Sequence, residues 1–492
     1  MKRRPLSDAV LVLLCLGIPA CAGTSRVRSA TGPGAGFLTG EAPMVRSLRE
    51  DTRLIPILTA GDTLFANNPG ELPFIFAGRA GGLGARDRGD GTAEVYVSHE
   101  DGWLESVEGA MVSRLMLDLR NAGVLAADYL LKPSQGYAAF AHAALLDSRS
   151  GFLHPQFVVN EKAHRARLPL VCAIDVLGGR IQDLPWLGAM RHKSAISLPA
   201  TGGKSLLILT GGSATQAADQ LYLYVANSDT DLLTTGNGQL YVFRANSRDV
   251  PSQTHSASSI RRGIPVEGSF VAVDQAAARS PIQLEGLVQS LGCLDFVRLE
   301  GLAVDRERLN GFYFTDRLGY GSTAVIRTAA GGGRLYHMTL DPFDPTRSAS
   351  LEVVLDAGDG DDLFRPSSID TDDRCVMIQE YPGSHGIHPS RILRYDLRVR
   401  RLEAIAECSE RDTRGRLVPR GVGGEWETSG ITNVSDLLGE DSWLFTVQAH
   451  TIESPQNSGR YGEAGQLVLL RGPRNPAAPV PRPPAPRSGS GP

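Results

Sequence analysis

Five glutamates with the chemistry of metal ligands each lie at the edge of a stretch that the sequence predicts to be a β-strand. They are Glu100, Glu161, Glu300, Glu380 and Glu427. Hard cations such as calcium take about six to eight oxygen ligands at about 2.3–2.6 Å, so several carboxylates would have to converge on one ion. We therefore treat these glutamates as candidate ligands of calcium, although a solvated or ion-paired carboxylate is the alternative at each position.

Two histidines lie at the ends of predicted strands near the same expected site. His99 directly precedes Glu100, and His450 follows a strand near the end of the chain. Imidazole titrates near neutral pH, so each is a candidate general acid or metal ligand, with a hydrogen-bonded structural role as the alternative.

The elements that must position these side chains form a repeat. Four strand-length beats follow one another from Leu299 to Leu355, and the same order returns at 365–408 and from Glu427 onward. A four-stranded unit that recurs every roughly 60 to 65 residues is typical of a β-propeller. The fold class is thus all-β, a propeller of about six four-stranded blades.

Two other segments complete this expectation. The strand around Leu54–Leu58 is the predicted partner that closes the last blade, and residues 120–146, rich in Ala and Leu, predict a helix that interrupts the pattern. Innermost strands of a propeller line its axis, so the glutamates at their starts are expected to meet at one end of it.

The N-terminus predicts export. Basic residues at 2–4 precede an apolar run at 9–18 and small residues at 19–21, the pattern of a signal peptide. The segment 18–21, Ile-Pro-Ala-Cys, is similar to a bacterial lipobox, which makes Cys21 the candidate lipidation site. Ordinary cleavage near Ala22 is the alternative.

The chain then divides into four parts: a signal peptide at 1–21, a tether at 22–43, the propeller at 44–472 and a Pro-rich tail at 473–492.

A formal net charge of −4 argues against nucleic acid as a partner, and 42% hydrophobic residues exclude wholesale disorder. Contact with a membrane is expected only through the lipid anchor. Export makes disulfides possible, but beyond Cys21 the cysteines are widely spaced and match no zinc pattern, and Cys172 and Cys375 are expected to be buried as small hydrophobic residues.

A colinear series of short motifs resembles the PhoX-type alkaline phosphatases, exported bacterial propellers. It begins with GGLGA (81–85), GDGTAEVYVSHE (89–100) and GAMVSRLMLD (109–118) and continues through RLEGLAVD (298–305), FRPSSID (364–370), IQEYPG (378–383), EWETSGI (425–431) and EAGQLVLL (463–470). The resemblance implies a phosphomonoesterase that depends on calcium and in part on iron. It also implies that Glu100, Glu161, Glu300, Glu380 and Glu427 stand where that family has carboxylates.

Four positions depart from the family pattern. Lys193 and Arg365 stand where the resemblance places acids, Gly301 follows Glu300 where an Asp is expected, and Tyr381 follows Glu380 where an Asp is expected. Lys193 and Arg365 add positive charge beside a multi-cation site, which would repel divalent ions. Arg365 and Lys193 are therefore expected to bind phosphate or carboxylate directly. The alternative is that the metal cluster has been lost and that these two residues only pair with neighbouring glutamates.

Three functions remain open on this basis. The first is a phosphomonoesterase with a reduced metal site, in which Arg365 and His99 take part in catalysis. The second is a binding propeller that has lost the metal cluster and recognises a phosphate ester or another anionic small molecule. The third rests on the motifs EGLAVD (300–305) and YFTD (313–316), which are similar to calcium-dependent lactonase propellers.

Overall fold

The structure of the protein is a computed structural model. It describes residues 36–64, 73–104, 107–163, 167–199, 202–212, 218–246, 248–250, 255–317, 332–381, 388–410, 426–453 and 463–473. The expected signal peptide, Cys21 and the tail beyond residue 473 lie outside these ranges. None of the helices within them is long and apolar enough to cross a membrane.

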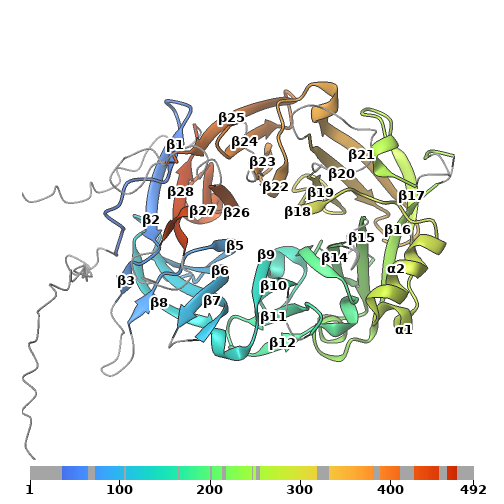
Figure 1. The fold of residues 1–492 in the computed structure, drawn as a ribbon, viewed down its shortest axis with the longest axis horizontal. Helices are drawn as coiled ribbons and strands as arrows, with labels where there is room; N and C mark the ends of the chain where they lie inside the picture. The colour runs from blue at the N-terminus through green and yellow to red at the C-terminus, as the bar shows by residue number, and fades with distance from the viewer. Residues whose placement is uncertain are drawn as a thin grey trace, which may run out of the picture.

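Six inner strands form a closed ring around a central axis (Figure 1). They are β5 (Ala80–Asp87), β9 (Ala139–Leu146), β13 (Arg191–Ile196), β18 (Leu299–Val304), β22 (Pro366–Thr371) and β26 (Glu427–Asn433). Each inner strand contacts the next one, and β26 contacts β5. The prediction of an all-β propeller is confirmed.

Each inner strand begins an antiparallel blade. Blade 1 continues with β6 (Thr92–Leu104), β7 (Val107–Asp118) and β8 (Val124–Leu131), and blade 2 with β10 (Gln156–Ala163), β11 (Val171–Asp175) and β12 (Ile181–Asp183). Blade 3 continues with β14 (Ser205–Gly212), β15 (Asp219–Ala226) and β16 (Gly238–Ala245), and blade 4 with β19 (Gly311–Asp316), β20 (Arg334–Leu340) and β21 (Ala349–Asp356). Blade 5 continues with β23 (Cys375–Glu380), β24 (Arg391–Asp396) and β25 (Arg401–Cys408), and blade 6 with β27 (Ser442–Glu453) and β28 (Glu463–Arg471).

The blades are not six separate four-stranded sheets. Strand β17 (Val266–Ala272) pairs with both β16 and β21, so blades 3 and 4 form one nine-stranded sheet. Strand β1 (Val45–Ser47) adds a fifth strand to blade 5. The chain between β17 and β18 also contains α1 (Gln275–Ala278) and α2 (Pro281–Ser290), and α3 (Ser435–Leu438) follows β26.

A strand near the N-terminus closes the ring. Strand β2 (Arg53–Thr59) pairs antiparallel with β28, so the first and last parts of the propeller share blade 6, as the stretch around Leu54–Leu58 predicts. A short hairpin of β3 (Thr63–Leu64) and β4 (Phe74–Ile75) follows. Upstream, the Phe37 side chain is buried and its backbone pairs with Val124, so the chain already packs on blade 1 at this point.

The helix expected at 120–146 is wrong, because β8 and the inner strand β9 occupy this segment. The alanines of β9 are small enough for neighbouring inner strands to approach closely: a Cβ on Gly82 of β5 would lie only 2.1 Å from the Ala143 nitrogen. Packing at the axis therefore overrides the helical preference of the local sequence.

Closure by β2 makes a prediction about stability. Leu58 is fully buried opposite Leu467 of β28, so Leu58→Ala should lower the free energy of unfolding by about 2–5 kcal/mol, measured by urea denaturation. Leu177→Ala, at a side chain that is 60% exposed, is the control and should change it by about 0.5 kcal/mol or less. Equal, small effects of both variants would show that β2 does not contribute to closure.

Candidate functional site

The inner strands all begin at one end of the axis, which we call the axial end. Thr371 of β22 donates a hydrogen bond to the Val304 carbonyl of β18, and the backbone amides of Gly430 and Asn433 donate to the side chains of Ser368 and Asp370. These contacts advance together along each strand, so β18, β22 and β26 run parallel. The second strand of each blade returns to the axial end.

All five predicted glutamates lie at this end. Glu300 and Glu427 are on the inner strands β18 and β26, and Glu100, Glu161 and Glu380 lie on the second strands β6, β10 and β23. The fold therefore gathers the predicted residues at one end, but the partners of each carboxylate decide its chemistry.

Glu100 lies between two cations. Its carboxylate oxygens accept hydrogen bonds from Lys162 Nζ and, at 2.5 Å, from Arg79 Nη2. Burial opposes the charge of Glu100, but Lys162 and Arg79 outweigh it and lower the pKa of the carboxyl. Each of the two carboxylate oxygens of Glu100 therefore accepts a hydrogen bond from a basic side chain.

Glu161 and Glu380 are fully buried and similarly paired. Arg167 Nη1 donates to Glu161 at 2.6 Å. Arg391 binds Glu380 in a bidentate manner at 2.7 and 2.8 Å, and the Phe364 backbone N–H donates to it at 2.8 Å. Burial raises the pKa of Glu380 despite the adjacent Arg391. Such bidentate pairs hold a carboxylate in fixed geometry.

Glu300 is surrounded by several cations. Its oxygen Oε1 lies 3.0 Å from Arg317 Nη2, 3.5 Å from Lys193 Nζ and 3.7 Å from Arg298 Nε. Burial opposes ionisation, yet Arg317 and Lys193 hold the pKa of Glu300 well below its usual range. His142 of β9 lies on the other oxygen, with Nε2 at 3.7 Å from Oε2, and its Nδ1 is 3.1 Å from Ser368 Oγ.

Glu427 differs from the other four. It is only 8% exposed, and its Oε2 atom has no hydrogen-bond partner among the described residues. Burial raises the pKa of Glu427, the nearby His450 partly opposes this, and the charge of Glu100 adds to it. This carboxylate is therefore poorly stabilised where it lies.

These surroundings do not fit a calcium or iron cluster. Four of the five carboxylates are bound by arginine or lysine, whose charges repel divalent ions. Within the described ranges, no group of three or more His, Cys, Asp and Glu side chains is placed to hold a metal ion. The donor set thus falls short of the oxygen ligands that calcium requires.

The axial end instead carries a group of basic side chains, which we call the cationic cluster: Lys193, Arg298, Arg317 and Arg365. The guanidinium groups of Arg317 and Arg365 lie over the ring of Tyr381, 4.1 and 5.1 Å from its centroid. Cation–π contacts of this kind hold arginines in place.

Mutual repulsion within the cationic cluster is visible in its pKa values. Burial, followed by the charges of Arg317 and Arg298, lowers the pKa of Arg365. Burial also lowers the pKa of Lys193, with Glu300 opposing and the two arginines adding to the effect. Arg317 is only 7% exposed, and its Nε atom has no hydrogen-bond partner in the described part of the chain. The cluster is short of negative charge.

Two buried aspartates behind the cluster do not restore the balance. Asp316 accepts hydrogen bonds from the backbone N–H groups of Val297 and Arg298, and burial raises its pKa to about 6. Asp219 accepts one from the Leu299 N–H, and burial raises its pKa to about 7. The cationic cluster has four basic side chains. Even if Glu300 and Asp316 are ionised and Asp219 is partly ionised, the acids supply less than three negative charges, so positive charge is in excess.

Arg365 and Arg79 share an uncommon backbone conformation. Their φ angles are 45° and 47°, and each directly precedes an inner strand, β22 and β5. A non-glycine residue in this left-handed region costs roughly 1–3 kcal/mol, and such residues concentrate at functional sites. The turn into each inner strand aims these side chains at the axial end.

The predicted histidines are placed differently. His99 is fully buried, its ring nitrogens lie 2.8 Å from Ser113 Oγ and 3.1 Å from the Gly78 carbonyl, and burial lowers its pKa to about 4. This geometry gives His99 a structural role inside blade 1. His450 pairs with Glu463, which together with Glu427 raises its pKa against the effect of burial.

The cysteines within the described ranges are buried, and three aspartates of the acidic loop at 356–362 are paired with arginines. Cys172, Cys293, Cys375 and Cys408 are buried and free. In the acidic loop at 356–362, Asp356 pairs with Arg334, Asp361 with Arg262 and Asp362 with Arg391.

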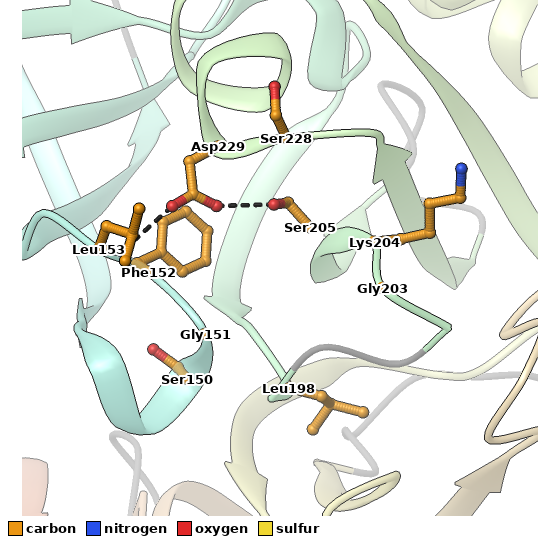
Figure 2. A pocket seen from close by; sticks show the side chains of 10 residues that line it. All are labelled: Ser150, Gly151, Phe152, Leu153, Leu198, Gly203, Lys204, Ser205, Ser228 and Asp229. Atoms are coloured by element: carbon orange, nitrogen blue, oxygen red, sulfur yellow. Dashed lines mark hydrogen bonds between the residues drawn. The ribbon is translucent and has the colours of Figure 1, made fainter.

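A cavity of about 260 Å³ lies between blades 2 and 3, at the end of the propeller opposite the predicted glutamates (Figure 2). In it, Asp229 accepts hydrogen bonds from Ser205 Oγ and the Leu153 N–H. The cavity contains no predicted site residue.

Sequence reasoning missed most of the cationic partners, including Arg79, Lys162, Arg298 and Arg317. A signal was present, because Arg79 and Arg298 directly precede strands β5 and β18 and Lys162 follows Glu161. Basic residues therefore recur at the same strand ends as the glutamates.

Fold and site together define a β-propeller with a cation-rich axial end. The chain is similar in structure to PhoX of Pseudomonas fluorescens, solved in complex with vanadate, with a TM-score of 0.59 and 11% identity over 89% of this chain and 97% of that one. Two weaker similarities are a Penicillium chrysogenum α-L-arabinanase with arabinobiose (TM-score 0.42, 8% identity, 80% and 94% covered) and a PQQ-bound aldose sugar dehydrogenase of Streptomyces coelicolor (0.34, 11%, 85% and 98%).

At these identities the comparisons establish the propeller fold alone. No protein-family model matches the chain, and no curated protein matches it significantly.

The raised pKa of Asp219 predicts a dependence of stability on pH. Its value of about 7 in the folded protein lies above the ordinary 3.8, so the folded state binds the proton more tightly. Its contribution to stability is therefore complete below about pH 4 and is lost as the pH rises to about 7. Relative to Asp219→Asn, the free energy of unfolding of the unmodified protein should fall over this interval in urea titrations. The exposed Asp436→Asn is the control, and parallel curves for Asp219→Asn would contradict the assignment.

Proposed function

We propose that the protein binds an anionic small molecule, foremost a phosphate ester, through the cationic cluster. The observation that carries this proposal is the sharing of one carboxylate, Glu300, by Lys193, Arg298 and Arg317, with Arg365 close enough to be repelled by two of them. An oxyanion would relieve that repulsion.

The residue types suit a phosphate group. Guanidinium groups donate paired hydrogen bonds to phosphate oxygens, and lysine adds a point charge. Arg317 has an unused buried donor, and the Arg298 side chain is 45% exposed, so a ligand can reach the cluster from solvent. The similar PhoX structure holds vanadate, described there as a transition state analogue, which is consistent with an oxyanion ligand on this fold.

In this proposal, side-chain cations replace metal ions as the positive charge at the axial end. Metal-dependent phosphomonoester hydrolysis and calcium-dependent lactone hydrolysis are the alternatives. Both require Glu100, Glu161, Glu300 or Glu380 to exchange a basic partner for a metal ion.

Binding should persist without metal. In isothermal titration calorimetry with EDTA, ethyl phosphate should bind the full-length mature protein, and Arg298→Gln should weaken it by about tenfold or more, since a charged hydrogen bond contributes about 1.5–3 kcal/mol. The exposed Arg398→Gln removes the same charge at the far end of blade 5 and should leave binding unchanged.

The same preparation separates the alternatives. Hydrolysis of p-nitrophenyl phosphate that requires calcium and stops with EDTA would favour the phosphomonoesterase, and lactone turnover under those conditions would favour the lactonase. Absence of ethyl phosphate binding in EDTA would overturn the proposed function.

We also propose that the protein is exported and anchored through Cys21, on the basis of the N-terminal sequence. Expression of the full chain in a bacterial host should give a membrane-associated, lipid-modified product detectable by mass spectrometry. Cys21→Ser should remove the lipid mass, and an unmodified wild-type N-terminus would refute the anchor.

A further inference from the structure

Glu427 lies beside the cationic cluster at the same height on the axis. The Gly430 N–H donates to Ser368 Oγ at 3.2 Å, which aligns β26 with β22 at these residues. The two strands run parallel, so Glu427, at the start of β26, and Arg365, directly before β22, both lie at the axial end of neighbouring blades. A ligand held by Arg365 is therefore next to this carboxylate.

Within the described part of the chain, Glu427 is the predicted glutamate whose carboxylate lacks a full set of partners. It is 92% buried, and its Oε2 atom accepts no hydrogen bond from the described residues. A buried acceptor without a donor loses its hydrogen bonds to water without replacement, and the cost is larger when the acceptor is charged. Such a group points to a donor that the ligand brings.

The cations nearest to Glu427 are committed elsewhere. The groups whose charges act on it are His450, Glu100, Lys162 and Arg317. Lys162 is bound to Glu100, His450 to Glu463, and Arg317 to Glu300; the thiol of Cys408 also lies close enough to be affected.

The two sides of the axial end differ in their charged side chains. Blades 3, 4 and 5 provide Lys193, Arg298, Arg317 and Arg365, with positive charge in excess. The side of blade 6 provides Glu427, and Glu463 and Glu100 of the same region are matched by His450, Arg79 and Lys162. The carboxylates and the cations of this side are thus equal in number, and Glu427 Oε2 still accepts no hydrogen bond from the described residues.

This inference deepens the proposed function and rests on it. We propose that the ligand is a small zwitterion, whose phosphate or other oxyanion binds the cationic cluster and whose protonated amine donates a hydrogen bond to the buried oxygen of Glu427. Glu427 then acts as the residue that selects amine-bearing anions.

The test compares two probes that differ only in the amine, O-phosphoethanolamine and ethyl phosphate, by calorimetry on the full-length mature protein in EDTA. Phosphoethanolamine should bind about tenfold or more tightly, because it adds a charged hydrogen bond. This comparison needs no variant, so it is independent of any effect of substitution on folding.

The isosteric variant Glu427→Gln then assigns the preference. It should weaken phosphoethanolamine by about tenfold and leave ethyl phosphate unchanged or tighter, because a nearby negative charge is removed. The exposed Glu50→Gln is the matched control and should alter neither. Thermal unfolding of each variant verifies that it is folded.

The outcomes are distinguishable. Equal affinity of the wild-type protein for both probes overturns the zwitterion and leaves anion binding intact, whereas binding of neither overturns the proposed function itself. Loss of both ligands in a folded Glu427→Gln protein also overturns the selective role of Glu427, and retention of the preference in that variant does the same.

Discussion

The chemistry of the axial end depends on one constraint: a carboxylate removed from water must find a compensating charge or hydrogen bond. Glu100, Glu161, Glu300 and Glu380 satisfy it with arginine or lysine at distances of about 2.5–3.7 Å. A metal ion would satisfy the same carboxylates, but the two solutions exclude each other, because a guanidinium and a divalent cation repel one another at such range. Side-chain cations therefore take the place that a metal ion would have beside these glutamates.

The close packing of the inner strands is the reason why these carboxylates are removed from water. Gly82, Gly301 and Gly430 lie where adjacent strands approach so closely that a Cβ would meet backbone atoms at 2.1, 2.5 and 1.9 Å. Below the axial end the strands are thus in contact, and His142 and Ser368 are linked across them. The charged side chains are held at the end of the axis, where the chain enters each inner strand, and the strained turns at Arg79 and Arg365 belong to these entries.

Much of the fold was predictable. Strand-length β-rich runs separated by Gly, Asp and Pro have a local physical cause, and their recurrence specifies a propeller, including closure by the stretch at Leu54–Leu58. The alanine-rich segment at 139–146 was not, because its strand conformation follows from close packing against β5. Nor was β17, whose pairing with two blades joins segments far apart in the chain.

The sequence alone determined which residue types stand at the strand ends: glutamates at five of them, and Lys193 and Arg365 where a metal site would need acids. Only the tertiary structure decided how these charges combine. Arg317 reaches Glu300 from the end of β19, Arg391 reaches Glu380 from β24, and one oxygen of Glu427 has no hydrogen-bond partner among the residues that the structure describes. The reason is that the energy of a buried charge depends on distance and on the loss of water, and neither is encoded by position along the chain.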